Sequence, residues 1–177
     1  APLVTGIVAL MLEANPNLTY RDVQDILVHT SERVDPGDAG WSQNGAGLWV
    51  NRNYGFGGID ATAAVNAAVS HALLGQELSF STGLQDVSQA IPDAGGASVA
   101  QTVNVASSNA ISIEHVQVIF NATHTANVGQ LDVVLTSPSG TQSILAKTRG
   151  GEGATAYSDW SFTSARHWDE SSAGDWT

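Results

Sequence analysis

The chain of 177 residues contains no cysteine and few basic residues. Without cysteine it has no disulfide framework, no thiolate zinc site and no cysteine nucleophile. Lysine and arginine number 6 against 17 aspartates and glutamates, which gives a formal net charge of −11. Nucleic acids and anionic membranes are bound through clustered Lys and Arg, so both classes of partner are disfavoured.

Long hydrophobic runs are also missing. The longest run, Leu3 to Leu12, is interrupted by Thr5 and Gly6 and is far shorter than the roughly 20 residues of a membrane helix. It follows neither an initiator Met nor a basic residue, which excludes a signal peptide. Because the chain starts at Ala1-Pro2 inside a helical pattern and stops where a strand pattern begins, we expect a fragment of a longer protein.

What is present is enough to build a folded protein. Hydrophobic residues make up 42% of the chain and glycine occurs 18 times, which indicates a turn-rich protein with a buried core. Up to His71 the apolar positions follow a helical period. Asn15-Pro16-Asn17 ends the first helix, Thr19 is the predicted N-cap of the second with Asp22 in the capping-box position, and Asp60 caps the third. The apolar faces expected for the first and third helices are Val4, Ile7, Val8, Met11 and Ala61, Ala64, Val65, Ala68, Val69.

Beyond Leu74 the helical period gives way to alternation, which predicts strands bounded by Gly, Pro, Asn or Ser. Within Leu131–Thr141 we expect a strand, a Ser-Pro-Ser-Gly turn and a returning strand. Three short helices without a sheet do not close a core, so residues 1–72 are predicted to be the remnant of a larger domain and residues 73–177 a β-sandwich. The alternating sets are Val103, Val105; Val116, Val118, Phe120; and Leu131, Val133, Leu135.

The opening residues resemble the helix that follows the nucleophilic serine in subtilisin-like serine proteases. In that family a Gly-Thr-Ser motif is followed, four residues after its serine, by a Pro that leads into an apolar helix with a Gly four residues later; Pro2 and Gly6 meet that last spacing. The resemblance places the nucleophile three residues before Ala1. A helix N-terminus at that point offers free N–H groups and a partial positive charge beside the oxyanion of acyl transfer.

Further motifs are similar to the kexin- or furin-like branch, the proprotein convertases. They are LEANPNLTYRDVQ at 12–24, NGAG at 44–47 and YGFGGIDA at 54–61, followed by LDVVLTSPSGT at 131–141, DWSF at 159–162, WDE at 168–170 and GDWT at 174–177. The last four resemble the P domain of that family. Ser172 departs from the resemblance, because the family often has Pro there.

The resemblance implies a mixed fold, in which the C-terminal helices of a subtilisin-like α/β domain precede an all-β jelly-roll sandwich. It also implies a secreted or periplasmic, calcium-dependent serine endopeptidase, which we expect to be bacterial. Its substrate would be protein or peptide, and the P domain would contact and stabilise the catalytic domain. The Ser-His-Asp triad would lie upstream, so we expect no catalytic or cofactor-binding residue in this chain and an inactive fragment.

The metal ligands stay undetermined from the sequence. Calcium binds six to eight oxygens, and no DxDxDG-like loop gathers them, so solvated acids are the competing interpretation. A minor site at Asp35–Asp38 or near Asp159 stays open. The acids concerned are Asp132, Asp159, Asp169, Glu170 and Asp175, and the histidines, none in a ligand-spaced pair, are His29, His71, His115, His124 and His167.

The aromatic residues of the second half leave one alternative open. They are Trp160, Phe162, Trp168 and Trp176, and we expect them in the sandwich core or on an interdomain surface. Exposed together, they would instead form a carbohydrate-stacking platform. The alternative function is therefore a non-catalytic β-sandwich module for adhesion or glycan binding.

Overall fold

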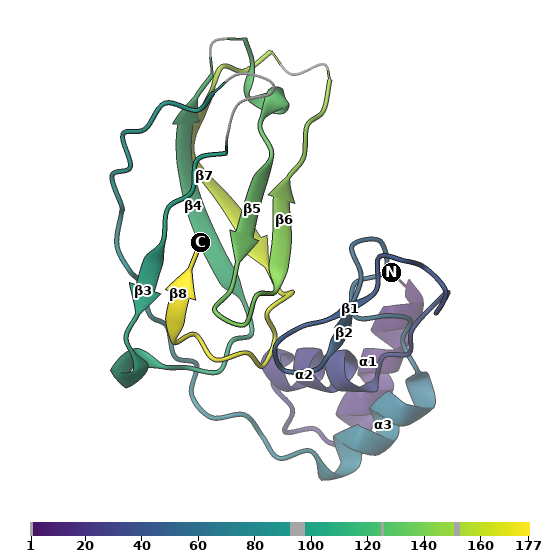
Figure 1. Cartoon of the computed structure of the whole chain (residues 1–177). Helices are drawn as coiled ribbons and strands as arrows, with labels where there is room; N and C mark the ends of the chain where they lie inside the picture. Colours follow the sequence, from purple (N-terminus) through teal and green to yellow (C-terminus); the bar gives the residue numbers. More distant parts are fainter. Residues whose placement is uncertain (1, 93–97, 125, 151–152) are drawn as a thin grey trace. The chain divides into compact units, whose positions relative to one another are not determined.

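The computed structural model describes residues 2–92, 98–124, 126–150 and 153–177, which form two compact units. The first unit runs up to Gln43 and from Gly47 to Leu78, and the second comprises Asn44–Ala46 and the chain from Ser79 to Thr177. Figure 1 shows helices in the first unit and most of the strands in the second. The predicted mixture of helices and strands is confirmed.

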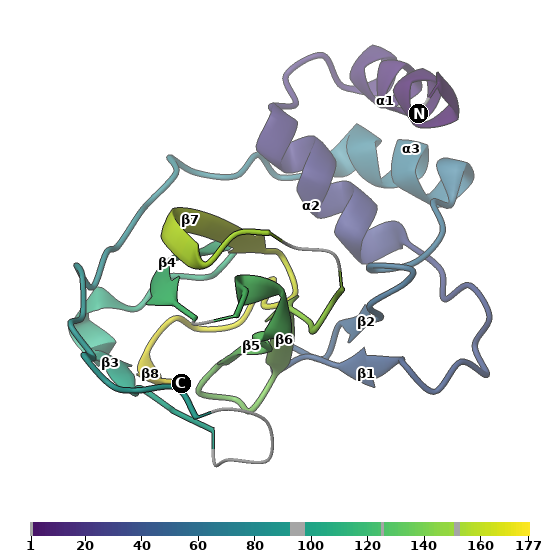
Figure 2. The same cartoon turned by 90° about the horizontal axis from the view of Figure 1, so that it is seen from above.

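The first unit is built on three helices. Figure 2 shows α3 beside both α1 and α2, and it packs against each of them. A short antiparallel pair of strands, in which Gln43 lies opposite Trp49, completes the unit. The elements are α1 (Pro2–Ala14), α2 (Tyr20–Thr30), β1 (Ser42–Gln43), β2 (Trp49–Val50) and α3 (Ala61–Ser70).

The helix ends follow the predicted signals. Helix α1 ends at Ala14, before the Asn-Pro-Asn sequence. The side chain of Thr19 accepts from the N–H of Asp22, and the Asp22 carboxylate accepts from the N–H of Thr19, so the capping box is complete. At α3 the carboxylate of Asp60 accepts from the N–H of Ala63 at 2.9 Å. These side chains satisfy N–H groups that a helix start leaves without intrahelical partners.

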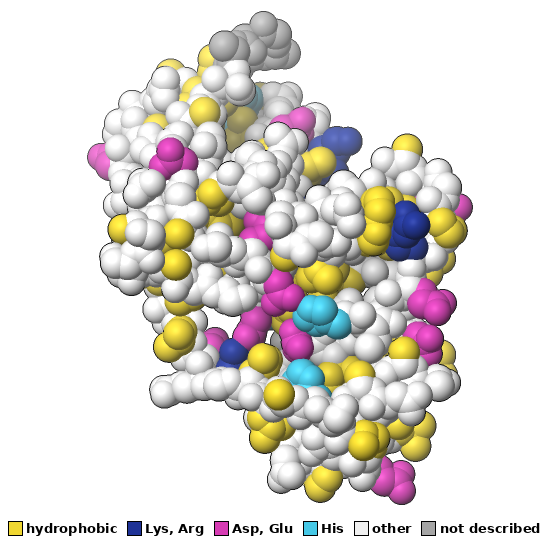
Figure 3. Space-filling model, turned by 60° about the horizontal axis from the view of Figure 1, so that its bottom comes forward, with side chains coloured by type: hydrophobic (Ala, Val, Ile, Leu, Met, Phe, Trp, Pro, Cys, Tyr) yellow, Lys and Arg dark blue, Asp and Glu magenta, His cyan; other side chains and the backbone are white. Residues whose placement is uncertain are grey.

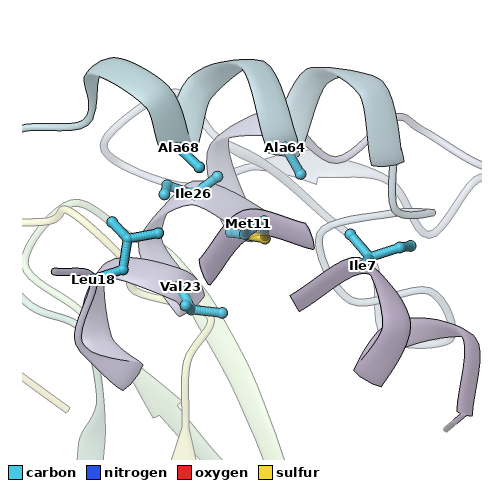
Figure 4. Packing of buried hydrophobic residues seen from close by; sticks show 7 residues of the cluster. All are labelled: Ile7, Met11, Leu18, Val23, Ile26, Ala64 and Ala68. Atoms are coloured by element: carbon cyan, nitrogen blue, oxygen red, sulfur yellow. The ribbon is translucent and has the colours of Figure 1, made fainter. Parts of the chain in front are cut away.

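One apolar cluster holds the three helices together. Figure 4 shows Ala64 and Ala68 pointing from α3 toward Met11 and Ile26. Alanines one turn apart let α3 approach its neighbours closely. The predicted apolar face of α3 was too wide, because Ala61 is exposed and Val69 is 64% exposed. The buried members are Ile7, Met11, Leu18, Val23, Ile26, Ala64 and Ala68.

The second unit contains three antiparallel strand pairs, β3–β8, β4–β7 and β5–β6. Two backbone hydrogen bonds between Thr136 and Thr177, of 2.6 and 3.0 Å, connect the end of β5 to the residue after β8. The strands are β3 (Val103–Val105), β4 (Val116–Thr123), β5 (Val133–Thr136), β6 (Gln142–Ala146), β7 (Ala156–Ser164) and β8 (Gly174–Trp176), with short 3₁₀ helices η1 (Ser107–Asn109) and η2 (Val128–Gln130).

The predicted strands are confirmed at β3 and β4 and in part at β5. The side chains of β4 alternate between half-buried and exposed positions along its whole length, as a period of two requires. Leu131 lies outside β5, because its N–H donates to the carbonyl of Val128 and closes the 3₁₀ turn η2. The expected hairpin is present, and Gly140 in its turn has φ +88°.

A β-bulge interrupts the pairing of β4 with β7 between Phe120 and Ala122. Opposite it, Asp159 has φ +47° and its N–H donates to Oδ1 of Asn121 at 2.7 Å. A residue in the left-handed region is characteristic of bulges, where glycine usually occupies it. The Asn121 side chain here supplies an acceptor for the N–H of the inserted residue.

Candidate functional site

Two carboxylates among the described residues are buried, Asp22 in the first unit and Glu170 in the second, and each accepts several hydrogen bonds. Asp22 is fully buried and Glu170 is 4% exposed. A buried carboxylate is stable only if hydrogen bonds or charges replace the water that it loses. We call their surroundings the Asp22 centre and the Glu170 centre.

The Glu170 centre joins three stretches of the second unit. Oε1 of Glu170 accepts from the N–H of Gly45 at 2.7 Å and from the hydroxyl of Thr141. The hydroxyl of Ser139 in turn contacts Thr141 Oγ1 at 3.2 Å and Ser137 Oγ at 2.8 Å. The turn between β5 and β6 therefore supplies a row of hydroxyls to one carboxylate.

Residues 44–46 are held in this centre by both side chain and backbone. Nδ2 of Asn44 donates to the carbonyls of Trp168 at 2.8 Å and Arg166 at 3.2 Å. A Cβ built on Gly45 would lie 2.3 Å from Cβ and Oγ of Ser139. Glycine is therefore required here for close approach.

His167 lies beside Glu170 and is fully buried. Its Nδ1 is 3.5 Å from Oε2 of Glu170, and its ring meets the edge of the Trp176 ring at a centroid distance of 5.1 Å. Burial lowers the pKa of His167, and the nearby Glu170 charge offsets part of that effect. His167 is therefore a neutral imidazole at neutral pH.

Hydrogen bonding keeps Glu170 ionised. Burial acts to raise its pKa, but the hydrogen bonds from Thr141, Ser137 and the Gly45 N–H together hold the pKa below its ordinary value. The negative charge therefore rests on donors from the β5–β6 turn and from residue 45.

The Asp22 centre is built in the same way from local and distant groups. Asp22 accepts from the N–H and hydroxyl of Thr19 at 2.7 and 2.6 Å and from the N–H of Leu74 at 2.7 Å. Nε2 of His71 lies 3.2 Å from its Oδ1. Burial acts to raise the pKa of Asp22, but the hydrogen bonds, that of Thr19 first, outweigh it and hold the pKa at about 2.

Both centres contain a histidine, a carboxylate and a hydroxyl, but not in the order of a catalytic triad. In a triad the imidazole lies between the carboxylate and the nucleophilic hydroxyl. Here the hydroxyls of Thr19 and Thr141 donate directly to Asp22 and Glu170, so the carboxylate lies between hydroxyl and imidazole. Each arrangement stabilises a buried charge and prepares no nucleophile.

The acids considered as calcium ligands are engaged with separate donors. Asp132 accepts from the backbone and hydroxyl of Thr148. The Asp159 carboxylate accepts from Nδ2 of Asn121 at 3.2 Å, and the Asp175 carboxylate accepts from Nδ2 of Asn104 at 2.6 Å. These carboxylates are satisfied by N–H and O–H donors rather than grouped around a common point.

At the loop Asp35–Asp38, Oδ1 of Asp38 accepts from the N–H of Gly40 at 2.7 Å and from Nδ2 of Asn51 at 2.8 Å. Within either unit, the described residues contain no three His, Asp or Glu side chains with ligand atoms within 4.8 Å of one another. Calcium needs six to eight oxygens, and the described acids of each unit contain no group of three from which such a ligand set would start.

The five histidines have different surroundings. His29 pairs with Asp25 on α2, and the ring of His115 meets Trp168 edge-on at 5.4 Å. His167 lies beside Glu170, whereas Asp169 is exposed and has φ +63°. His124 accepts from Ala126 N at 3.3 Å, and His71 belongs to the Asp22 centre.

The aromatic side chains divide between core and surface. Trp168 is 2% exposed and Trp176 is buried against Val105 and Ile113. Phe162 is half-buried and packs against Tyr157 at 5.8 Å, whereas Trp160 is 52% exposed. The expectation of a core role holds for Trp168 and Trp176, and one exposed Trp does not make a stacking platform.

The fold accommodates Ser172 at the position where the family often has Pro. Its N–H donates to the carbonyl of Ile111 at 2.9 Å, and its hydroxyl accepts from the N–H of Ile111 at 2.9 Å. A proline has no N–H and could not make the first bond. Serine therefore pairs the two segments through backbone and side chain together.

The surface agrees with the acidic composition. On the face drawn in Figure 3, carboxylates are spread among uncharged side chains, and the visible basic groups form no large patch. None of the described helices has the length and hydrophobicity to cross a membrane.

The contacts of Asn44 with the carbonyls of Trp168 and Arg166, and of Gly45 with Glu170, were not predicted from the sequence. Gly45 and Glu170 belong to motifs already noted, NGAG and WDE, but spacing along the chain does not reveal that 125 positions are bridged by one hydrogen bond. The two motifs are therefore explained by mutual contact rather than by catalysis.

Comparisons with known proteins match both parts of the chain. Residues 1–57 match the subtilase family and residues 113–177 the proprotein convertase P-domain. The chain is 39% identical to Furin-1 of Xenopus laevis over 181 residues and 38% identical to PC3-like endoprotease variant B of Hydra vulgaris over 180 residues. Each match covers 99% of the chain but 23% and 25% of the relative, so the chain spans about a quarter of their length.

A solved structure agrees with these sequence matches. The serine protease of Aeromonas sobria superposes with a TM-score of 0.84 at 26% identity, over 97% of this chain and 34% of that protease. The chain therefore belongs to the kexin- or furin-like subtilisin-type serine proteases, the proprotein convertases, which carry a P domain.

Proposed function

We propose that the chain is part of a serine endopeptidase that cleaves protein or peptide substrates by acyl transfer. In this proposal residues 1–72 are the C-terminal remnant of the catalytic domain, and residues 73–177 are a P domain with the jelly-roll topology of a β-sandwich. One observation carries the proposal: a subtilase match at residues 1–57 precedes a P-domain match at residues 113–177 on a single chain.

The chemistry would be performed by groups upstream of Ala1. A serine activated by a His–Asp pair attacks the scissile carbonyl, and an oxyanion hole of an Asn side chain and backbone N–H groups holds the developing charge. The contribution of this chain is α1, whose N-terminal N–H groups and dipole would face the nucleophile. Buried Ile7 and Met11 anchor that helix on α2 and α3.

The P domain is proposed to stabilise the catalytic domain. Support comes from Asn44–Ala46, which lies in the stretch matched to the subtilases. Its Asn44 and Gly45 are nevertheless bonded to Trp168, Thr141 and Glu170, in the stretch matched to the P domain. Loss of these bonds would leave a buried carboxylate with fewer donors.

Calcium dependence and export are proposed for the whole protein on the same family basis. The described acids of each unit form no group of three with close ligand atoms, and the calcium ligands of the parent would be supplied mostly by the catalytic domain upstream. We propose a secreted or periplasmic location and a bacterial source. The glycan-binding alternative is not favoured, since the subtilase match accounts for the first part of the chain.

The test compares the 177-residue chain with a longer protein that includes the coding sequence upstream of Ala1. We expect the longer protein to hydrolyse a panel of fluorogenic peptides, and a serine-directed sulfonyl fluoride to abolish the turnover. The 177-residue chain should show no turnover on the same panel. Inhibitor-sensitive hydrolysis by the short chain, or none by the longer protein in calcium-containing buffer, would contradict the proposal.

A further inference from the structure

The dipeptide Asn44-Gly45 is the one Asn-Gly sequence among the 177 residues. Asn followed by Gly is chemically vulnerable, because the backbone nitrogen of the glycine can attack the side-chain amide carbon with little steric hindrance. The structure holds this dipeptide in a way that blocks the reaction. The block depends on Glu170, to which no catalytic or binding role is assigned.

We propose that Asn44 is a latent self-modification site, which stays inert while Gly45 is bound to Glu170 and deamidates irreversibly once that contact opens. In the reaction the Gly45 nitrogen loses its proton to solvent base and bonds to Cγ of Asn44. The Cγ–Nδ2 bond breaks and ammonia leaves, giving a cyclic imide. One water then opens the imide at either carbonyl, leaving an aspartyl or isoaspartyl residue at position 44.

The nucleophile of this reaction is occupied in the folded unit. The Gly45 N–H donates to Oε1 of Glu170 at 2.7 Å and to Oγ1 of Thr141 at 3.0 Å. Removing its proton would place an amide anion against a carboxylate in a buried site, where like charges repel strongly. The Glu170 charge therefore opposes the deprotonation that starts the reaction.

The electrophile is immobilised as well. Nδ2 of Asn44 donates to the carbonyls of Trp168 and Arg166, and Oδ1 accepts from the N–H of Ala46 at 3.0 Å. The side chain is buried, with 5% of its surface exposed. To reach the Gly45 nitrogen, Cγ would have to give up these bonds, so the reaction requires local opening of the segment.

The modification would prevent residues 44–46 from returning to the Glu170 centre. A carboxylate at position 44 has no N–H to donate to the carbonyls of Trp168 and Arg166, and it adds a negative charge near Glu170. Buried acceptors left without donors are costly. The opening of residues 44–46 would therefore become permanent. Glu170 would then also lose the hydrogen bond from the N–H of Gly45.

The experiment follows deamidation of the 177-residue chain at mildly alkaline pH by mass spectrometry of the tryptic peptide 34–52. This peptide contains Asn51 as an internal reference for general hydrolysis. Isoaspartate is scored with an isoaspartyl methyltransferase. We expect conversion of Asn44 to be slow in native buffer and fast in denaturant, with Asn51 unchanged. Equal rates in the two buffers would overturn the proposal.

The Glu170→Gln variant tests the specific block. A hydrogen bond to a charged group is stronger than one to a neutral group, so we expect conversion of Asn44 in native buffer to rise about tenfold. Asp175→Asn, which removes an exposed carboxylate from the same unit, should leave the rate unchanged. Equal rates for the Glu170 variant, the Asp175 variant and the wild type would overturn the proposal.

If Glu170→Gln unfolds the chain, as circular dichroism would reveal, Thr141→Val replaces it, because it removes one acceptor of the Gly45 N–H and keeps the charge. Its rate should lie between those of the native and denatured wild type; the native rate would overturn the proposal. As a second readout, chain deamidated in denaturant and refolded should melt at lower temperature than undamaged refolded chain. Identical melting curves would contradict the claim that the segment cannot return.

Discussion

The backbone N–H of Gly45 donates to the carboxylate of Glu170 at 2.7 Å across 125 positions of the chain. This contact helps to hold Asn44–Ala46, which belong to no helix or strand, in the second unit. Because the donor is a backbone group, only proline would remove it, but any other side chain at position 45 can displace it. The Glu170 centre therefore depends on the absence of a side chain at one residue.

The first prediction concerns that residue. Gly45→Ala should lower the free energy of unfolding by about 1–3 kcal/mol, because its Cβ would lie 2.3 Å from Ser139 in a closely packed centre. Urea denaturation followed by tryptophan fluorescence measures the change. Gly153→Ala, where an added Cβ meets nothing within 4 Å, is the matched control and should be close to neutral. Equal stability of the two variants would show that residue 45 has room to adapt.

The second prediction concerns acid stability of the helices. The pKa of Asp22 is about 2 in the folded chain against an ordinary value of 3.8, so the folded state favours the ionised form. The stability is present above pH 3.8 and is lost as the pH falls toward 2, by about 2 kcal/mol in total. Denaturation curves at several pH values, read by far-UV circular dichroism, should show this loss.

Asp22→Asn should be less stable at neutral pH and should lack most of the acid dependence, since no charge remains to be neutralised. Asp25→Asn on the same helix is the control, and its acid dependence should match that of the wild type. If the Asp22 variant kept the wild-type slope, the Asp22 centre would not be the source of the acid sensitivity.

The third prediction concerns milder acid. Burial lowers the pKa of His167 below its ordinary value of 6.5, so the unfolded chain takes up a proton before the folded chain does. The contribution of His167 to the free energy of unfolding should therefore be fully present above neutral pH and decline as the pH falls below 6.5. Glu170 adds a further loss below 4.5, because its pKa is also lowered. Fluorescence of buried Trp168 and Trp176 reports on this unit.

His167→Gln should remove the decline that begins near pH 6.5 and keep the one that Glu170 causes at lower pH. His29→Gln, at an exposed position on α2, should retain both. A profile of the His167 variant that coincides with the wild type at every pH would assign the first decline to another group.

The fourth prediction compares the stability contributions of two tryptophans, Trp160 in β7 and Trp168 in the segment after it. Trp168→Ala should cost about 3–5 kcal/mol, because the side chain is 2% exposed and its removal leaves a large cavity. Trp160→Ala should cost much less, since its ring is half exposed and its ring contacts are with Tyr157 and Phe162. Thermal melting distinguishes them. A similar loss from both would place Trp160 in a shared core.

The helices could be predicted closely because their signals are local. Thr19 and Asp22 lie three residues apart, as do Asp60 and Ala63, and each pair settles a helix start through contacts within one turn. The face of α3 was predicted less well, because hydrophobicity marks Val69 as a core residue while only the packing of α1 and α2 decides which side is covered.

The Glu170 centre could not be predicted, because it is assembled from residues 45, 141 and 170, which no periodicity relates. His167, Asp169 and Glu170 are close in sequence, but only the folded chain shows that Glu170, and not the exposed Asp169, lies beside the histidine. Similarly, Leu131 continues the alternation of β5 but closes the turn η2 instead. Long-range contacts and turn geometry therefore determine the partners of Glu170 and the start of β5, which the spacing of residues in the sequence does not.

The bulge opposite Asn121 has a consequence for the aromatic residues of β7. Alternate residues of a strand share a face. In a regular strand Tyr157, at an odd position, would therefore lie on the opposite face from Trp160 and Phe162, at even positions. The extra residue at Asp159 shifts the phase of the alternation, and the three rings meet on one side at centroid distances of 5.8 to 6.4 Å. Odd-numbered residues before the bulge therefore share a face with even-numbered residues after it. A single inserted residue decides which aromatic side chains are neighbours.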